Sequence, residues 1–402
     1  MTTAPVILCL NSGSSSLKFA LYQLGGGTDT ALVEGAVERI GLPNGRLSVH
    51  AQTSGLSREE LGAFHDHQAA VQAAFDSLEQ LQLPTPEAVG HRIVHGGADH
   101  IAPEQVDARL LEDLRQLAPY APLHLPAEIQ GIEAVTARFP HLPQVACFDT
   151  AFHRRMPELA QRFPLPRAIW DAGVRRYGFH GLSYEYIIDE VGATALGRAV
   201  IAHLGNGASM AAILDGTSVD TTMGFSPVSG LVMGSRSGDL DPSVVIRLIQ
   251  ENKMPPPEVN ALLNKQSGLL GVSGSSEDMR DLLDRESTEP HAADAIQIFC
   301  YSAKKYIGAY AAALGGLDTL VFTAGIGENA PRIRERICSG LDFLGFKIDA
   351  ARNNANVPLI STDDSNVKVR VIKTNEDLMI ARHTARLLSQ QAKSETPDPA
   401  RS

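Results

Sequence analysis

Three short segments rich in glycine, serine and asparagine each follow a predicted strand in this sequence. They are residues 11–16, 205–208 and 325–329. Glycine and serine allow successive backbone N–H groups to turn toward an anion such as a phosphate. One such segment is as readily a tight turn, but three in one chain favour phosphate binding by at least two of them.

The third segment leaves two chemistries open. The P-loop pattern G-x-x-x-x-G-K-[ST] does not occur in the sequence, which excludes a Walker-type nucleotide site. Residues 325–330 fit G-x-G-x-x-A after a predicted strand, and Asp349 follows where a dinucleotide fingerprint places its acid, about 20 residues on. A nicotinamide-dependent oxidoreductase is therefore an alternative. The position near the C-terminus, and the segment at residues 11–18 that it leaves unexplained, weigh against it.

Basic side chains near these segments could hold a phosphate or a carboxylate. Lys18 is the basic residue of the first predicted hairpin, and it is either an outward-facing strand residue or a point charge on a phosphate. Arg92 ends a predicted strand, and Arg236 lies in a polar segment. An arginine fork matches the oxygens of a carboxylate or phosphate. Arg236 could instead pair with Asp239 or Asp241.

The composition limits the classes of protein to which the chain can belong. Its 402 residues, 44% of them hydrophobic, are enough for two or three domains. The formal net charge of −11 argues against a nucleic-acid partner, because such proteins usually carry a basic patch. We find no segment with the length and composition of a membrane span or a signal peptide, so we expect a cytoplasmic protein without a membrane partner.

The four cysteines give no sign of a metal or disulfide framework. Cys9, Cys147, Cys300 and Cys338 lie far apart, and none has C-x-x-C spacing. We expect buried thiols in a reducing compartment. The polar segment 391–402, which contains two prolines, is predicted to be disordered.

The order of the predicted elements repeats between the two halves of the chain. Alternating apolar residues predict strands, and apolar residues at helical spacing predict helices. In the first half, the predicted strands are residues 6–10, 17–22, 32–40, 46–50, 88–95 and 144–148, and the predicted helices begin near residue 66 and cover 106–117 and 126–139. In the second half, the predicted strands are 199–204, 209–214, 218–222, 318–323 and 367–372, and the predicted helices are 241–252, 291–314 and two that begin at 331 and 374.

Each half is thus predicted to form a three-stranded meander with a glycine loop in its first hairpin, followed by alternating helices and strands. This pattern predicts an α/β fold with an internal duplication. We expect two similar lobes with a cleft between them, because ligands usually bind in clefts between domains.

Eight segments, in order, resemble the motifs of the acetate kinase family. They are residues 11–18, 90–97, 148–153, 177–181, 203–207, 233–242, 325–329 and 374–376. The resemblance extends from residue 6 to about residue 388. It implies two RNase H-like lobes of the ASKHA superfamily (sugar kinases, Hsp70 and actin) with a nucleotide-binding cleft between them. The lobes would be residues 1–152 with 377–402, and residues 153–376.

The same resemblance implies a homodimer that converts ATP and acetate to ADP and acetyl phosphate with Mg²⁺, which Mn²⁺ could replace. Arg92 would hold the substrate carboxylate, and His180 and Arg236 would stabilise the transition state. Asp149 would donate or accept a proton. The other implied roles are magnesium binding by Asn11 and Glu376, phosphate binding by Lys18, nucleotide binding by His203, Leu204, Gly205, Asn206, Gly207, Asp278, Met279, Arg280, Gly325, Ile326, Gly327, Glu328 and Asn329, and a methyl pocket lined by Val94, Leu123, Phe179 and Pro227.

The chemistry of phosphoryl transfer supports most of these roles and questions one. Negative charge spreads over the equatorial oxygens of the transferred group, so catalysis is mainly positioning and electrostatics. His180 can serve either as a charged group or as a neutral donor, and the alternative for a lone histidine in a turn is a structural role. A small carboxylic acid, with a pKa of about 4.3, is already ionised at neutral pH and needs no general base. We therefore expect Asp149 to orient Arg236 or a magnesium-bound water.

Some features leave alternatives open. Glu376 could instead belong to a capping box with Thr374 and Asp377 at the start of a helix. Leu125 and Ser229 depart from the family pattern beside the expected substrate pocket, which leaves room for propionate. An extra methylene changes binding by only about 1–3 kcal/mol. A nucleotide-gated binding module that transfers nothing is a further alternative.

Overall fold

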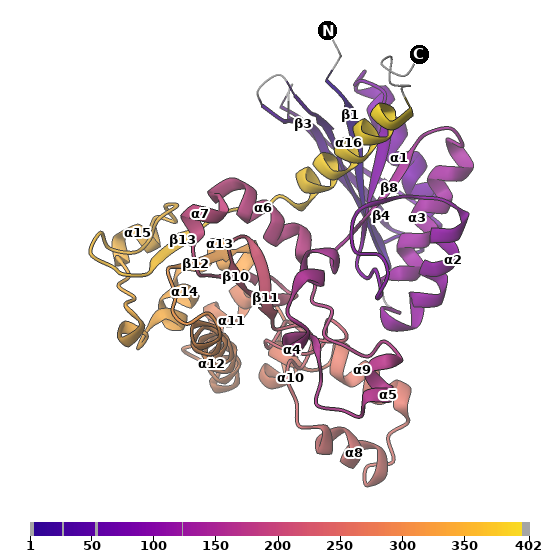
Figure 1. Cartoon of the computed structure of the whole chain (residues 1–402). Helices are drawn as coiled ribbons and strands as arrows, with labels where there is room; N and C mark the ends of the chain where they lie inside the picture. The colour runs from indigo at the N-terminus through magenta and orange to yellow at the C-terminus, as the bar shows by residue number, and fades with distance from the viewer. Residues whose placement is uncertain (1–3, 26–27, 53–54, 123, 396–402) are drawn as a thin grey trace. The chain divides into compact units, whose positions relative to one another are not determined.

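The computed structural model describes residues 4–25, 28–52, 55–122 and 124–395. The chain forms two compact units, coloured along the chain in Figure 1. The first unit contains residues 1–152 and 375–402, and the second contains residues 153–374. Each unit has its own β-sheet with helices packed against it. Within the described residues, no helix combines the length and the apolar character that crossing a membrane requires.

The first unit is built on an eight-stranded sheet with the order β5-β4-β3-β2-β1-β6-β8-β7. Strands β1 to β5 form an antiparallel meander, whereas β1, β6 and β8 run parallel to one another. The carboxyl ends of these three parallel strands therefore meet at one edge. The strands are β1 (Val6–Gly13), β2 (Ser16–Gln23), β3 (Thr30–Glu38), β4 (Gly45–Ala51), β5 (Leu56–Gly62), β6 (Ala88–Ile93), β7 (Glu104–Gln105) and β8 (Gln144–Phe148).

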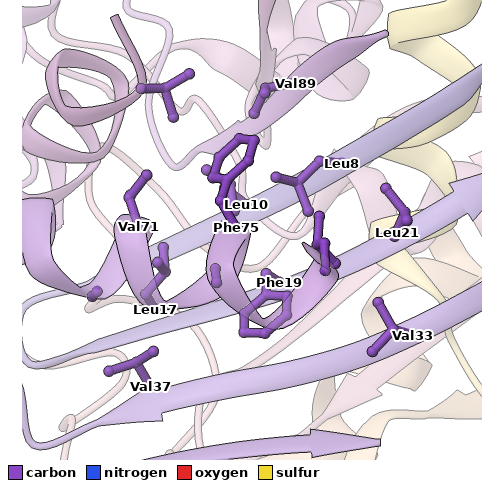
Figure 2. Packing of buried hydrophobic residues seen from close by; sticks show 14 of the residues in the cluster. Leu8, Leu10, Leu17, Phe19, Leu21, Val33, Val37, Val71, Phe75 and Val89 are labelled. Carbon is purple, nitrogen blue, oxygen red and sulfur yellow. The ribbon is translucent and has the colours of Figure 1, made fainter. Parts of the chain in front are cut away.

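Helices pack against both faces of this sheet. The helices are α1 (His67–Gln80), α2 (Ala108–Leu117), α3 (Leu125–Arg138) and α16 (Glu376–Glu395). The side chain of Asp66 caps α1 by accepting a hydrogen bond from the Ala69 N–H at 2.8 Å. Figure 2 shows the hydrophobic core that α1 forms with the sheet, in which Phe75 lies among Leu10, Phe19 and other buried apolar side chains.

The opposite face of the sheet packs against α16. A Cβ at Gly90 would lie only 2.4 Å from Cγ2 of Ile380, so a side chain there would exclude the helix. In the sheet, Cys9 of β1 pairs with Gly90 of β6. Two residues further along β1, Asn11 pairs with Lys18 of β2. Because side chains alternate between the faces of a sheet, Asn11 and Lys18 lie on the same face as α16. The register that pairs Arg92 with Cys147 places Arg92 there as well.

The second unit repeats the central part of this sheet. Its strands are β9 (Ala199–Leu204), β10 (Ala208–Leu214), β11 (Thr217–Thr221), β12 (Thr319–Thr323) and β13 (Lys368–Val371). The order β11-β10-β9-β12-β13 corresponds to β3-β2-β1-β6-β8 of the first unit, with the same antiparallel meander followed by two parallel strands. The predicted α/β fold with an internal duplication is confirmed.

Helices of very different lengths surround the second sheet. Its longest helix, α12 (Pro290–Ala313), packs against α10, α11 and α14. The other helices are α4 (Glu158–Gln161), α5 (Arg167–Asp171), α6 (Gly181–Val191), α7 (Ala193–Leu196), α8 (Pro242–Gln250), α9 (Pro256–Lys265), α10 (Gly268–Ser273), α11 (Met279–Arg285), α13 (Ala324–Asn329), α14 (Pro331–Cys338) and α15 (Ala350–Asn354).

The structure corrects several local predictions. The first meander has five strands rather than three. The predicted strand at residues 46–50 joins it as β4, and β5 pairs with β4 although its residues are almost all exposed and lack an apolar pattern. Residues 11–13 belong to β1 rather than to a loop, since the hairpin turns at Ser14 and Ser15. The segment predicted to be disordered is helical in α16 as far as Glu395, and its remainder, 396–402, lies outside the described residues.

The third glycine segment is also corrected. Residues 325–329 belong to the short helix α13 rather than to a loop. The carboxylate of Glu328 accepts a hydrogen bond from the backbone N–H of Ala324 at 2.8 Å, which ties the start of this helix to its side. Ala324 has φ of +63°, so the chain turns sharply between β12 and α13. The sequence pattern of a glycine loop does not reveal a side chain that closes the loop into a helix.

Candidate active site

An ion pair lies at the edge of the first sheet where the parallel strands end. Nη2 of Arg92 lies 2.5 Å from Oδ2 of Asp149, and Nε lies 3.3 Å from Oδ1. Asp149 directly follows β8 and is fully buried. Burial alone would lower the pKa of Arg92, but the carboxylates of Asp149 and Glu376 raise it above its ordinary value. The guanidinium is therefore charged and fixed in orientation by a forked contact.

Two further oxygen-bearing side chains lie beside the same guanidinium. Oδ1 of Asn11 is 3.4 Å from Nη1 of Arg92, and Oε2 of Glu376 is 3.6 Å from Nε. Glu376 is the first residue of α16, and the next residue, Asp377, has its pKa raised to about 6 by burial and by the charge of Glu376. Within the described parts of the chain, no cluster of three or more His, Cys, Asp and Glu side chains could hold a metal by itself. One amide and one carboxylate oxygen suit Mg²⁺, which commonly takes the rest of its shell from phosphate and water.

The structure places the other predicted residues of the first unit nearby, with one exception. The side chain of Lys18 is exposed and opens onto a cavity of about 400 Å³ that Glu34 and Asp377 also line. Val94 follows β6, two residues after Arg92, and is buried. Leu123, predicted to line the methyl pocket, lies outside the described residues.

In the second unit, His180 is held by hydrogen bonding and stacking. His180 has φ of +59° and precedes α6. Its Nδ1 lies 2.9 Å from Oγ of Ser209, which in turn lies 2.5 Å from the hydroxyl of Tyr184. The imidazole stacks on that of His203 with ring centroids 4.1 Å apart. The ring of His180 is thus oriented by groups of β10, α6 and β9.

The side chains of His180 and Arg236 both lie next to Gly207. A Cβ at Gly207 would lie 3.6 Å from Nε2 of His180 and 3.6 Å from Nη1 of Arg236. Nη1 of Arg236 also donates to the carbonyl oxygen of Pro227 at 3.2 Å. The absence of a side chain at Gly207 leaves space next to two groups that can stabilise negative charge. Phe179, the residue before His180, is buried.

The acids considered as partners of Arg236 have other roles. Oδ1 of Asp239 accepts a hydrogen bond from the Gly230 N–H at 2.8 Å, and Oδ2 contacts the hydroxyl of Tyr306. Asp241 caps α8 by accepting from the Ser243 N–H at 2.8 Å.

A cavity of about 560 Å³ in the second unit gathers three of the predicted nucleotide segments. Its lining is formed by Gly205, Asn206, Glu277, Asp278, Met279, Arg280, Gly325, Ile326, Asn329 and Ala330. Cavities of this size accommodate ligands as large as a nucleotide. His203, Leu204, Gly207, Gly327 and Glu328, also predicted to bind nucleotide, are not among the lining residues.

The sequence matches the Acetokinase family over residues 6–382. The chain belongs to this family. An acetate kinase of Rhodopseudomonas palustris is 48% identical in an alignment of 400 positions that covers 95% of this chain and 98% of that protein. Acetate kinase 2 of Clostridium perfringens is 44% identical in an alignment of 403 positions that covers 96% of this chain and 100% of that protein.

Solved structures of an acetate kinase and a propionate kinase are similar to this chain along nearly its whole length. The acetate kinase of Porphyromonas gingivalis superposes with a TM-score of 0.87 at 38% identity, covering 96% of this chain and 100% of that one. A propionate kinase of Francisella tularensis superposes with a TM-score of 0.89 at 39% identity, covering 95% and 99%. The predicted family and two-lobed fold are confirmed, and the alternative of a nicotinamide-dependent oxidoreductase is set aside.

Two residues hold α13 of this acetokinase-family chain in place: Glu328, which was expected to bind nucleotide, and Arg334, about which the sequence analysis made no prediction. Glu328 holds the Thr374 N–H at 3.1 Å in addition to that of Ala324, which ties α13 to the chain that follows β13. Arg334, fully buried, donates from Nη1 to the carbonyl oxygens of Gly327 and Glu328, both at 2.9 Å. The two residues fix α13 from both ends.

Other positioning residues that the sequence analysis did not name are polar side chains within largely apolar elements, and this contrast could have indicated them. Ser209 interrupts the apolar strand β10 and reaches His180. Ser183 lies on α6 and reaches Nδ1 of His203 at 2.8 Å. Glu128 lies in the first turn of the largely apolar helix α3 and is buried. A polar residue at a buried position of an element is usually retained for a hydrogen bond.

Proposed function

We propose that this protein is an acetate kinase, which reversibly transfers the γ-phosphoryl group of ATP to the carboxylate of acetate and yields acetyl phosphate and ADP. The observation that carries the proposal is the arrangement around Gly207. Its loop brings His180 and Arg236 to one point, and the same loop contributes Gly205 and Asn206 to the nucleotide-sized cavity. Two charge-stabilising groups next to a nucleotide-sized cavity suit phosphoryl transfer, in which negative charge develops on the transferred group.

The transferred group is stabilised mainly by electrostatics. In phosphoryl transfer, charge develops on the equatorial oxygens of the phosphoryl group. His180 and Arg236 can donate hydrogen bonds to those oxygens, and their orientation is already set by Ser209 and by the carbonyl of Pro227. Donors fixed in advance need little reorganisation during the reaction, which is the main source of their effect.

The acceptor is a carboxylate held by Arg92. Arg92 is charged and pinned by Asp149, so it presents a fixed positive group. Asp149 orients this arginine, whereas the sequence had suggested Arg236 or a magnesium-bound water as the group that it orients. It does not act as a base, because the carboxylate of acetate is already ionised at neutral pH. The resemblance to the family supports a methyl pocket formed by Val94, Leu123, Phe179 and Pro227.

Magnesium belongs to this proposal through Asn11 and Glu376, whose oxygens lie 3.4 and 3.6 Å from nitrogens of Arg92. When bound, Mg²⁺ (or Mn²⁺) supplies positive charge that neutralises the phosphates of ATP. Lys18, on the same face of the sheet, adds a point charge for a phosphate. The nucleotide itself is held by residues 203–207, 278–280 and 325–329, of which His203, Leu204, Gly207, Gly327 and Glu328 act by shaping the loops.

The identity of the acid substrate, acetate or propionate, is the most specific element of the proposed function. The similarity to a propionate kinase of Francisella tularensis keeps propionate as a second candidate, but acetate kinases of up to 48% identity favour acetate. The test is an acyl phosphate assay in which hydroxylamine traps the product from ATP and Mg²⁺ with acetate, propionate or butyrate. We expect the highest kcat/KM with acetate. Higher kcat/KM with propionate would reassign the substrate, and tight ATP binding without any acyl phosphate would leave only a nucleotide-gated binding module.

We also propose a cytoplasmic homodimer, on the resemblance to the family. Sedimentation at micromolar concentration should give twice the mass of one chain. A monomer at concentrations where the enzyme is fully active would reject this part of the proposal.

A further inference from the structure

A buried acid lies near Arg92 in the first unit and has no part in the proposed chemistry. Glu128 is 2% exposed and sits in the first turn of α3. Its Oε2 accepts a hydrogen bond from the backbone N–H of Val94 at 3.1 Å. Its Oε1 is buried and has no hydrogen-bond partner among the described residues. A buried carboxylate that leaves one oxygen without a hydrogen bond loses its hydration without replacement, which disfavours its charged form.

The surroundings of Glu128 already contain an excess of negative charge. Arg92 pairs with Asp149 at 2.5 Å and lies 3.6 Å from Glu376, so two carboxylates share one guanidinium. An ionised Glu128 would be the third. A substrate carboxylate at Arg92 would then be the fourth, and it would be repelled by the net charge of the group.

We propose that Glu128 is a positioning residue for the carboxylate substrate, because its uncharged carboxyl group fixes the backbone at Val94 and leaves the charge of Arg92 available to the substrate. This inference rests on the proposed function. Glu128 also supplies the hydrogen-bond acceptor for the backbone N–H of Val94, which would otherwise be buried without one. The uncharged acid can both accept the Val94 N–H at Oε2 and keep the proton on Oε1.

The pKa of Glu128 agrees with this role. Burial raises it to about 8, against the lowering effects of Arg92 and of the Val94 N–H, and the charge of Asp149 raises it further. Ionisation of Glu128 is therefore expected just above neutral pH, within the range in which enzymes are commonly assayed.

The other elements packed against α3 contribute little charge at this point. From β1, Ser12 is the uncharged group that faces the helix at Gly131. From β6, buried His91 is neutral, because burial lowers its pKa to about 4. From α1, His67 bonds to a backbone carbonyl at 2.8 Å, and from α2, Arg115 is engaged by Glu133 at 2.7 Å.

The sign of the pH effect follows from linkage. Acetate binds to the form in which Glu128 is uncharged, so binding is complete below the pKa and weakens as the pH rises through about 8. The KM for acetate should therefore increase about tenfold between pH 7 and pH 9, whereas kcat at saturating acetate should not follow this change.

The test compares the wild type with Glu128→Gln and Glu133→Gln. The glutamine of the first variant keeps an acceptor for the Val94 N–H but cannot ionise, so its KM for acetate should stay flat from pH 7 to pH 9. Glu133 is an exposed residue of the same helix, so its variant should show the wild-type increase. A flat wild-type KM, or an equal increase in Glu128→Gln, would overturn the inference. A wild type that forms no acyl phosphate would instead overturn the proposed function.

A measurement on the wild type alone guards against a variant that fails to fold. Acetate is titrated into the protein with ADP and Mg²⁺ at pH 8, in two buffers of different ionisation enthalpy. We expect an uptake of about half a proton per acetate bound at pH 8 and almost none at pH 6. Zero uptake at both pH values would contradict the role of Glu128.

Discussion

Asp149 holds Arg92 through a forked contact, with Nη2 and Oδ2 2.5 Å apart, and the carboxylate is completely buried. This contact gives the aspartate a use that requires no proton transfer. A largely buried guanidinium that loses its counter-charge would both turn and destabilise the first unit. The role of Asp149 as an orienter can therefore be separated from a role as a base.

Asp149→Asn should lower kcat/KM for acetate by about 10²–10³-fold, since the amide keeps the shape but not the charge that fixes Arg92. The pH dependence of kcat/KM should keep its wild-type shape, because no titrating base is lost. Asp149→Ala should also reduce the free energy of unfolding by about 3–5 kcal/mol, the cost of leaving a buried charge unpaired.

A surface ion pair supplies the control for this prediction. Arg46 and Glu38 lie 2.7 Å apart, and both side chains are about half exposed. Glu38→Gln should change the unfolding free energy by at most about 1 kcal/mol. The orienter role would be wrong if Asp149→Asn removed the acidic limb of the pH profile.

Gly207→Ala should lower kcat by about 10²-fold, because the new methyl group would lie 3.6 Å from both His180 and Arg236 and displace the transferred group. Protein stability should change little, since the backbone of Gly207 is not in the left-handed region. The measurement is kcat at saturating ATP and acetate, with thermal unfolding in parallel.

Gly308→Ala is the matched control for Gly207→Ala. Gly308 lies inside α12, and a Cβ there would meet no heavy atom of the described residues within 4 Å beyond its own helix backbone and chain neighbours. Alanine there should leave kcat unchanged and stabilise the helix by up to about 1 kcal/mol. Equal kcat in the two variants would show that the space at Gly207 is not used by the transferred group.

Local patterns were enough to predict the strands that position Arg92 and Asp149, but not the helices α6 and α13 of the second unit. Short, mostly apolar segments located β1, β6 and β8, so Arg92 and Asp149 were both expected at strand ends. The carboxyl ends of these parallel strands meet at one edge. The helix predicted to begin near residue 66 begins at His67, directly after the capping residue Asp66. These features depend on residues close together in the sequence.

Other features depend on contacts that local patterns do not contain. Glu128 meets Val94 across 34 residues, and Arg334 closes α13 from the following helix. Strand β5 has an exposed, polar sequence and exists because β4 offers a free edge. In each case the deciding partner lies outside the local pattern, so the residue itself carried only a weak signal.

Glu376→Gln should raise the Mg²⁺ concentration needed for half-maximal acyl phosphate formation by about 10–100-fold, because a neutral amide replaces the carboxylate that lies beside Arg92. Chelation by EDTA should abolish the reaction, and added Mg²⁺ should restore it. Glu79→Gln, an exposed residue of α1, is the control and should leave the Mg²⁺ requirement unchanged. An unaltered requirement in Glu376→Gln would remove Glu376 from the magnesium site.

Two buried histidines should make the protein sensitive to mild acid. His91 pairs with Oε1 of Gln144 at 2.8 Å, and His153 pairs with the carbonyl of Phe179 at 3.0 Å and with Ser218 at 2.8 Å. Burial lowers the pKa of each to about 4, only partly offset by these hydrogen bonds. Each histidine is therefore neutral in the folded protein but has its ordinary pKa of about 6.5 in the unfolded chain.

The sign follows from these lowered values. The neutral imidazoles contribute fully to the stability of the folded protein above about pH 6.5. This contribution is lost as the pH falls toward their pKa of about 4 in the folded protein. Each histidine should lower the free energy of unfolding of the protein by about 2 kcal/mol between pH 7 and pH 5. Urea titrations at both pH values would measure this decrease. His91→Gln, which keeps a side chain able to bond Gln144, should reduce this loss in the first unit, and a wild-type loss that does not change in this variant would contradict the assignment.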